Sequence, residues 1–271
     1  MQDQIVIEKL SGEFFFVDGL AWSRTGFLVA ADVLRKTLYR FDSSPRPRIL
    51  RENDGGASGV AYDVQGRLYI CESDTRRISR MDRQGAVDPF IETFEGKKFN
   101  APNDIVVRRD GHIWFTDPAF GSADDHRELD FHGIFHASPK GEVDAIAKWK
   151  TRPNGIALSP DGRLLYVADS DRHAIAVFDI DRNGAAANQR DFVRGIDGVP
   201  GGLKTDEKGR LFVCARGITV FSTAGKQEMK FMEDRIVVNC SFGDGDGSTL
   251  YVSVRSEIYK TSVGVKGAFQ Y

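Results

Sequence analysis

The stretch PNGIALSPDGRLLYVAD, from Pro153 to Asp169, contains the pattern from which the fold can be deduced. It predicts a short strand, a tight turn and a second strand. In the turn, Pro160 presets its own φ angle, and Gly162 accepts a backbone conformation that other residues avoid. The second strand is rich in Leu, Tyr and Val, which suit a buried pleated surface.

This unit recurs along the chain. A turn glycine followed by an apolar strand occurs six times, at Gly26, Gly66, Gly111, Gly162, Gly209 and Gly247, with separations of 40, 45, 51, 47 and 38 residues. A period of about 44 residues with three or four short strands is the signature of a β-propeller blade. We therefore predict an all-β chain, a six-bladed β-propeller with four-stranded blades, formed as a single domain over residues 1–271. A pair of β-sandwich domains does not explain six evenly spaced copies.

Ring closure requires one blade to use both ends of the chain. We expect the strand-like segment Ile5–Leu10 to pair beside Ile258–Lys260, which removes the free sheet edges. The polar stretch from Gly121 to Glu128 is expected to form a long loop on one face.

Composition excludes several classes of partner. Of the 271 residues, 41% are hydrophobic and 28% are charged, with a net charge of 37 − 39 = −2. No run of Lys and Arg exceeds two residues, so we expect neither nucleic acid nor a membrane as a partner. The N-terminus has no basic segment followed by an apolar core, and Cys71, Cys214 and Cys240 fit buried thiols in a reducing compartment. We expect a cytoplasmic protein, a monomer or weak homodimer, that binds a small molecule.

Loops that lead into the innermost strands of a propeller gather at one end of the central channel, where ligand sites are usually built. The segments in question are Asp18–Leu20, Asp54–Ser58, Pro102–Asp104, Pro153–Gly155, Pro200–Gly202 and Val238–Cys240. Carboxylates and amides converging there would form an oxygen-rich site of low charge, suited to Ca²⁺, Mg²⁺ or Mn²⁺. Any one of these asparagines, taken alone, also fits a loop residue that bonds its own backbone.

Several longer segments resemble the six-bladed gluconolactonase family, which includes the senescence-marker and luciferin-regenerating proteins. The resemblance is densest in Phe99–Val107, Ile113–Pro118, Arg152–Ala157 and Asn239–Gly243, and Cys71-Glu72 with Arg76–Arg80 is similar to the bacterial lactonase branch. It implies one divalent cation, Ca²⁺ first, with Mg²⁺, Mn²⁺ or Zn²⁺ as alternatives.

The family's ligand motifs imply particular residues here. Its two asparagines match Asn103 and Asn154. Asp18 stands where the family has a Glu, and Gly201 stands where it has an Asp that also serves as base or nucleophile. This second departure removes both a charge and a proton acceptor from the implied site.

Two hypotheses follow. The first is a metal-dependent hydrolase of a lactone or related cyclic ester. Asp18, Asn103 and Asn154 would hold the metal, and Asp104 would orient the site or activate water as the catalytic residue. The substrate would lie near Glu72, Arg76 and Asn239. The alternative is a non-hydrolytic propeller that binds a small ligand or a protein, or runs a different reaction, without the carboxylate at position 201. We favour the enzyme because the other site motifs remain legible.

Overall fold

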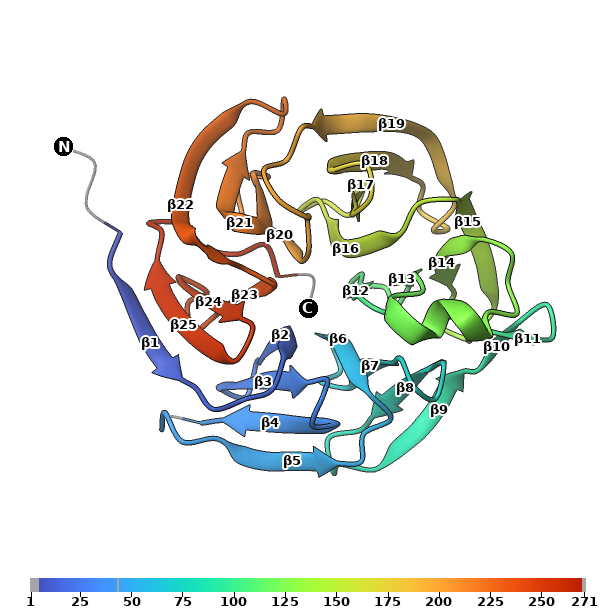
Figure 1. The fold of residues 1–271 in the computed structure, drawn as a ribbon, viewed down its shortest axis with the longest axis horizontal. Coiled ribbons are helices and arrows are strands. Elements are labelled where there is room, and N and C mark those ends of the chain that lie inside the picture. Colours follow the sequence, from blue (N-terminus) through green and yellow to red (C-terminus); the bar gives the residue numbers. More distant parts are fainter. Residues whose placement is uncertain (1–4, 43, 270–271) are drawn as a thin grey trace.

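In the computed structural model, which describes residues 5–42 and 44–269, six antiparallel sheets are arranged as blades around a central channel (Figure 1). The predicted six-bladed propeller is confirmed. Residues 1–4, on which the expectation of no signal peptide partly rests, lie outside the described residues.

Each blade is formed by consecutive strands. Blade 1 consists of β2 (Val17–Ser23), β3 (Phe27–Asp32), β4 (Thr37–Phe41) and β5 (Arg48–Glu52). Blade 2 consists of β6 (Ala57–Tyr62), β7 (Leu68–Glu72), β8 (Arg77–Met81) and β9 (Val87–Ile91). Blade 3 consists of β12 (Ile105–Val107), β13 (Ile113–Asp117), β14 (His132–Ala137) and β15 (Val143–Trp149). Blade 4 consists of β16 (Pro153–Leu158), β17 (Leu164–Asp169), β18 (Ala174–Ile180) and β19 (Ala186–Arg194).

The fifth blade has the predicted four-position arrangement, but two of its positions belong to one long strand. Its sheet contains β20 (Leu203–Thr205), β21 (Leu211–Phe221) and β22 (Gln227–Ile236). Strand β21 is 11 residues long and has Gly217 at a φ of +75° in its middle. Its first half pairs with β20 and its second half with β22. The two halves of β21, on either side of Gly217, therefore take the positions of the second and third strands of the other blades.

The sixth blade closes the ring as predicted. It contains β23 (Asn239–Gly243), β24 (Thr249–Val254) and β25 (Glu257–Ser262), and its outer strand is β1 (Ile7–Ser11). In the β1–β25 pair, Ile7 lies opposite Thr261 and Lys9 opposite Tyr259. Two short elements lie outside the blades, the hairpin of β10 (Thr93–Phe94) with β11 (Lys97–Lys98) and the 3₁₀ helix η1 (Gly121–His126). Helix η1 lies within the segment Gly121–Glu128, which was expected to form a long loop.

The repeat glycines explain why the pattern was so regular. All six have positive φ, between +68° and +88°, a conformation in which a side chain is strained.

The hydrophobic core lies between neighbouring blades. Six clusters of buried side chains each combine residues of two adjacent blades, and the last of them, which includes Phe14, Leu20 and Ile258, seals blade 6 against blade 1.

No helix within residues 5–42 and 44–269 has the length and apolar character needed to cross a membrane. All three cysteines are buried and free.

Candidate functional site

One cavity at one end of the channel is lined by the entry residue of every blade, among other residues. It has a volume of about 870 Å³. The six entry residues that line it are Asp18, Ser58, Asn103, Asn154, Gly201 and Val238. The structure therefore brings the three residues predicted as metal ligands into one cavity, and places Gly201 in the same ring.

Close backbone packing holds this ring of entry residues together. A Cβ atom on Gly19 would lie 2.1 Å from the carbonyl oxygen of Ser58 in the next blade, and one on Gly155 would lie 2.1 Å from that of Gly201. Real Cβ atoms do not approach oxygen so closely, so glycine is required after the entry residue in both blades. The blades consequently meet backbone to backbone at the channel.

Ser58 connects two of the predicted ligands, a role that was not predicted. Its Oγ donates to Asp18 Oδ2 at 2.8 Å and lies 3.3 Å from the Nδ2 donor of Asn103. Asn239 donates through Nδ2 to the other oxygen of Asp18 at 3.3 Å, and its own Oδ1 accepts the N–H of Cys240. Aligning the x-Gly pairs that open blades 1, 2 and 4 would have identified Ser58 from sequence.

Asn154 is fixed by hydroxyl groups at the ends of two second strands. Its Nδ2 donates to Ser170 Oγ at 3.0 Å, and its carbonyl oxygen accepts from Thr116 Oγ1 at 2.7 Å. Because Asn103 and Asn154 both use Nδ2 to contact a serine, their Oδ1 atoms remain as oxygen donors within the described part of the chain.

Asp104 lies beside this cavity but is not among the residues that line it. Its carboxylate is buried and accepts the backbone N–H of Ile156 at 3.1 Å and of Ile105 at 3.0 Å. Burial raises the pKa of Asp104. Burial, followed by the negative charge of Asp104, raises the pKa of Asp18 to about 6. Through its hydrogen bond with the N–H of Ile156, Asp104 connects the entry of blade 3 to strand β16 of blade 4.

Glu72, Arg76 and Asn239, all predicted to lie near the substrate, are absent from the described lining of this cavity. Glu72 is fully buried and accepts from Arg51, Arg77 and Thr75 at 2.8, 2.7 and 2.6 Å. Burial alone would raise the pKa of Glu72, but these hydrogen bonds outweigh it and the pKa is lowered. Arg76 donates to the carbonyl oxygen of Phe99 and pairs with Glu128 at 3.1 Å.

Glu72 ends the second strand of its blade, as Asp32, Asp117 and Asp169 do in theirs. Asp117 accepts the backbone N–H groups of Asn100 and Ala101, both at 2.8 Å, and so holds the segment that leads to Asn103. Burial raises the pKa of Asp117 to about 7. Carboxylates at this position support the loops around the cavity.

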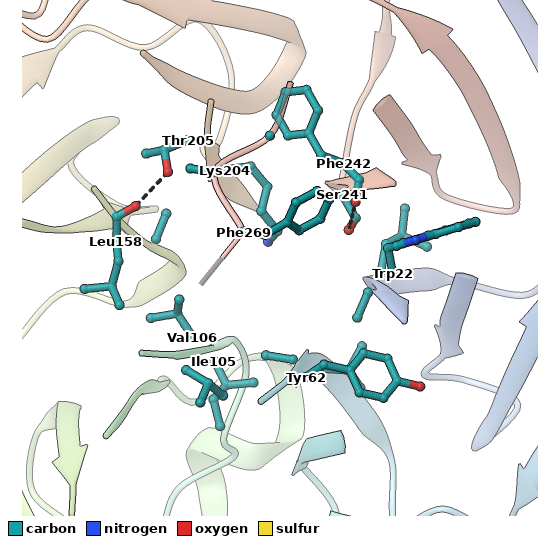
Figure 2. A pocket seen from close by; sticks show the side chains of 18 of the residues that line it. Trp22, Tyr62, Ile105, Val106, Leu158, Lys204, Thr205, Ser241, Phe242 and Phe269 are labelled. Atoms are coloured by element: carbon teal, nitrogen blue, oxygen red, sulfur yellow. Dashed lines mark hydrogen bonds between the residues drawn. The ribbon is translucent and has the colours of Figure 1, made fainter. Parts of the chain in front are cut away.

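The opposite end of the channel holds a smaller cavity of about 90 Å³ (Figure 2). Ile105, Val106 and Leu158 line it together with Phe269 near the C-terminus (Figure 2). Lys204 also lines it and donates through Nζ to the carbonyl oxygen of Leu203 at 3.1 Å. This end lacks the predicted ligands, so the larger cavity is the candidate site.

The oxygen donors of the larger cavity fit a hard divalent cation in type. One carboxylate and two amide oxygens, from Asp18, Asn103 and Asn154, are the kinds of ligand that Ca²⁺ takes. Within the described ranges, His, Cys, Asp and Glu form no group of three or more able to hold a metal. The amide oxygens therefore have to complete any such site.

Comparisons with known proteins agree with this architecture. The family described as the SMP-30/Gluconolactonase/LRE-like region matches residues 16–256. The chain belongs to this family. A gluconolactonase of Zymomonas mobilis subsp. mobilis is 30% identical to it, over 94% of this chain and 80% of that protein. The solved gluconolactonase of Xanthomonas campestris is 28% identical, with a TM-score of 0.90 over 96% of this chain and 90% of that one.

A more distant solved relative, a calcium-binding regucalcin from Agrobacterium tumefaciens, shares the fold. It is 19% identical to this family member, with a TM-score of 0.83 over 97% of this chain and 95% of that one.

Proposed function

We propose that this chain is a divalent-cation-dependent hydrolase of a lactone or related cyclic ester, acting at the large cavity as a single domain. The observation that carries the proposal is that Asp18, Asn103 and Asn154 line one cavity, with both amide nitrogens engaged by serines. The gluconolactonase relatives support the reaction type, and the relative described as calcium-binding supports Ca²⁺ ahead of Mg²⁺, Mn²⁺ or Zn²⁺.

A bound cation would polarise the lactone carbonyl and activate water. Asp18, Asn103 and Asn154 would hold it. Among the described lining residues, the carboxylates are Asp18 and Asp74, and Asp74 pairs with Lys36 at 2.7 Å. We therefore assign Asp18 as the acceptor for the proton of the attacking water.

Asp104 is assigned a positioning role, one of the two roles that the sequence left open. Its hydrogen bond to the N–H of Ile156 fixes the strand that carries Asn154, while Asp104 itself follows Asn103. It thus sets the separation of the two amide ligands. Asn239 positions Asp18 in the same way, through its Nδ2 contact.

The non-hydrolytic alternative rests on Gly201. The space that a Cβ atom would take there lies 2.5 Å from the carbonyl oxygen of Val238. Because residue 201 is glycine, the family's carboxylate is absent, and the carbonyl oxygen of Val238 in the next blade crowds the space that a side chain would take. A small-ligand-binding propeller is the function that this observation favours.

Hydrolysis assays distinguish the hydrolase from the small-ligand-binding propeller. The protein is treated with a chelator, reloaded separately with Ca²⁺, Mg²⁺, Mn²⁺ or Zn²⁺, and assayed on δ-valerolactone and glucono-δ-lactone by acid release. We expect cation-dependent hydrolysis that falls at least tenfold in Asn103→Ala, since a ligand is removed. Asn183→Ala, in an exposed turn of blade 4, is the matched control and should retain activity. Absence of hydrolysis with every cation would overturn the hydrolase proposal.

Three buried, free cysteines are consistent with a reducing cytoplasm. We propose that the protein works there as a monomer or weak homodimer on a small-molecule substrate.

A further inference from the structure

The mouth of the site cavity is unusually apolar. Seven large hydrophobic side chains are exposed in the described part of the chain, and four of them line this cavity: Phe15, Leu34, Val199 and Ile236. Leu34 is 66% exposed and Phe15 is 61% exposed. Contiguous exposed apolar surface next to a cavity marks a binding site rather than ordinary surface. We call these four residues the apolar rim.

The rim occupies one side of the mouth. Phe15 precedes β2 and Leu34 follows β3 in blade 1, whereas Val199 leads into β20 and Ile236 ends β22 in blade 5. Blade 6 lies between them (Figure 1) and adds Val238 to the lining. The apolar rim is therefore contributed by blades 5 and 1, and blade 6 between them adds Val237 and Val238 together with the polar residues Arg255 and Ser256.

Polar groups on the other side are already engaged. Ser73 donates to the carbonyl oxygen of Pro102 at 2.8 Å, Asp74 pairs with Lys36, and Ser58 donates to Asp18. A sugar lactone carries several hydroxyl groups, and each would lose a water partner on binding without gaining a protein partner. Apart from Arg255, Ser256 and the amide oxygens of Asn103 and Asn154, the described lining therefore offers few polar groups to the hydroxyls of a sugar.

One residue of the rim, Phe15, is fixed in place. The N–H of Phe15 donates to the buried carboxylate of Asp32 at 2.9 Å, and the guanidinium of Arg35 lies 4.3 Å from the centre of the Phe15 ring.

The cavity volume, about 870 Å³, is near the top of the range that holds drug-sized ligands, about 300–1,000 Å³. The site can accommodate a substrate with a long substituent.

We infer that the substrate is a lactone or cyclic ester bearing an apolar chain, with its ring at Asp18, Asn103 and Asn154 and its chain along the apolar rim. This inference rests on the proposed function, and it goes further by naming the substrate class. The occupant is a small molecule because the rim lines the same cavity as the predicted ligands. Docking to a membrane is an outcome that the test separates.

The test uses a series of δ-lactones with alkyl substituents of one to eight carbons, with δ-valerolactone and glucono-δ-lactone as references. Burying a methylene is worth about 0.8 kcal/mol, so kcat/KM should rise roughly two- to fourfold for each methylene that the rim covers. The double variant Leu34→Gln/Val199→Gln should lower kcat/KM for the longest lactone at least tenfold. The matched control is Ile49→Gln. Ile49 is exposed to the same extent as Val199, 56%, but lies outside the cavity lining, so this variant should match the wild type.

A binding measurement separates failure of this inference from failure of the hydrolase proposal. Alkyl δ-lactams, which resist hydrolysis, are titrated by calorimetry into the same variants. Affinity that rises with chain length and falls in the double variant supports the apolar subsite even where no lactone is hydrolysed.

Three results would overturn the inference. One is hydrolysis that favours glucono-δ-lactone without dependence on chain length. Another is a chain-length dependence that survives in the double variant. The third is a rate that rises only above the critical micelle concentration, which would make the rim a membrane-docking surface.

Discussion

Replacing Gly155 by alanine tests the close packing that builds the site. The new Cβ atom would lie 2.1 Å from the carbonyl oxygen of Gly201 and 2.7 Å from the Cα atom of Gly202. Both neighbours are backbone atoms, which cannot rotate away, so blades 4 and 5 have to separate. Overpacking of this kind typically costs 1–3 kcal/mol, and we expect the upper end, about 3 kcal/mol. For a chain of this size the melting temperature should fall by roughly 6–12 °C.

Thermal unfolding followed by circular dichroism measures the effect. Gly245→Ala is the control, because a Cβ atom there has no heavy atom within 4 Å and its φ is ordinary. It should change stability by no more than about 0.5 kcal/mol. Since Gly155 follows Asn154, cation affinity should fall with stability in Gly155→Ala. A Gly155→Ala protein as stable as the control would refute the packing argument.

Burial, followed by the neighbouring His112, lowers the pKa of His136 to about 4, whereas the unfolded chain has a histidine pKa of about 6.5. Because the unfolded state then binds a proton that the folded state does not, the free energy of unfolding should fall by up to about 3 kcal/mol as the pH drops from about 6.5 to about 4. His136→Gln should remove that part of the pH dependence in denaturant titrations, and exposed His126→Gln should not; equal slopes in both would contradict the assignment. Gly201→Asp should strengthen Ca²⁺ binding by adding charge, yet lower stability by about 1–3 kcal/mol because of the Val238 carbonyl oxygen; calorimetry showing unchanged affinity would argue against position 201 facing the cation. Ser58→Ala should lower the affinity for the cation on the order of 10- to 100-fold. A calorimetric titration identical to that of the wild type would show that the contacts of Ser58 with Asp18 and Asn103 do not contribute to cation binding.

Most of the fold could be predicted from sequence because one local requirement repeats. Gly66 and Gly162, like the other turn glycines of the repeat, need positive φ, and the spacing of such positions counts the blades. The pairing of Ile7 with Thr261 followed from the need to remove free edges. In blade 5 the second and third strands are joined through Gly217 into the single long strand Leu211–Phe221, a detail that the repeat pattern does not distinguish.

The candidate site was predictable only where a residue sits at a blade entry. Asn103 and Asn154 were placed correctly in one cavity, because entry loops of a propeller converge. Side-chain direction could not be predicted: Asp104 turns to the N–H of Ile156, and Glu72 turns to two arginines. Ile156 lies 52 residues from Asp104, and Arg51, one of the two arginines, lies 21 residues from Glu72, so a motif alone does not reveal these partners.

Calorimetric titration of the chelator-treated protein with Ca²⁺ tests the central claim most directly, because it asks whether Asp18, Asn103 and Asn154 act as one cation site. Wild type should bind one ion per chain. Asn154→Ala should lose that binding, and Asn183→Ala should retain it. Wild-type protein that binds neither Ca²⁺, Mg²⁺ nor Mn²⁺, or an Asn154→Ala protein that binds as tightly as wild type, would contradict the account.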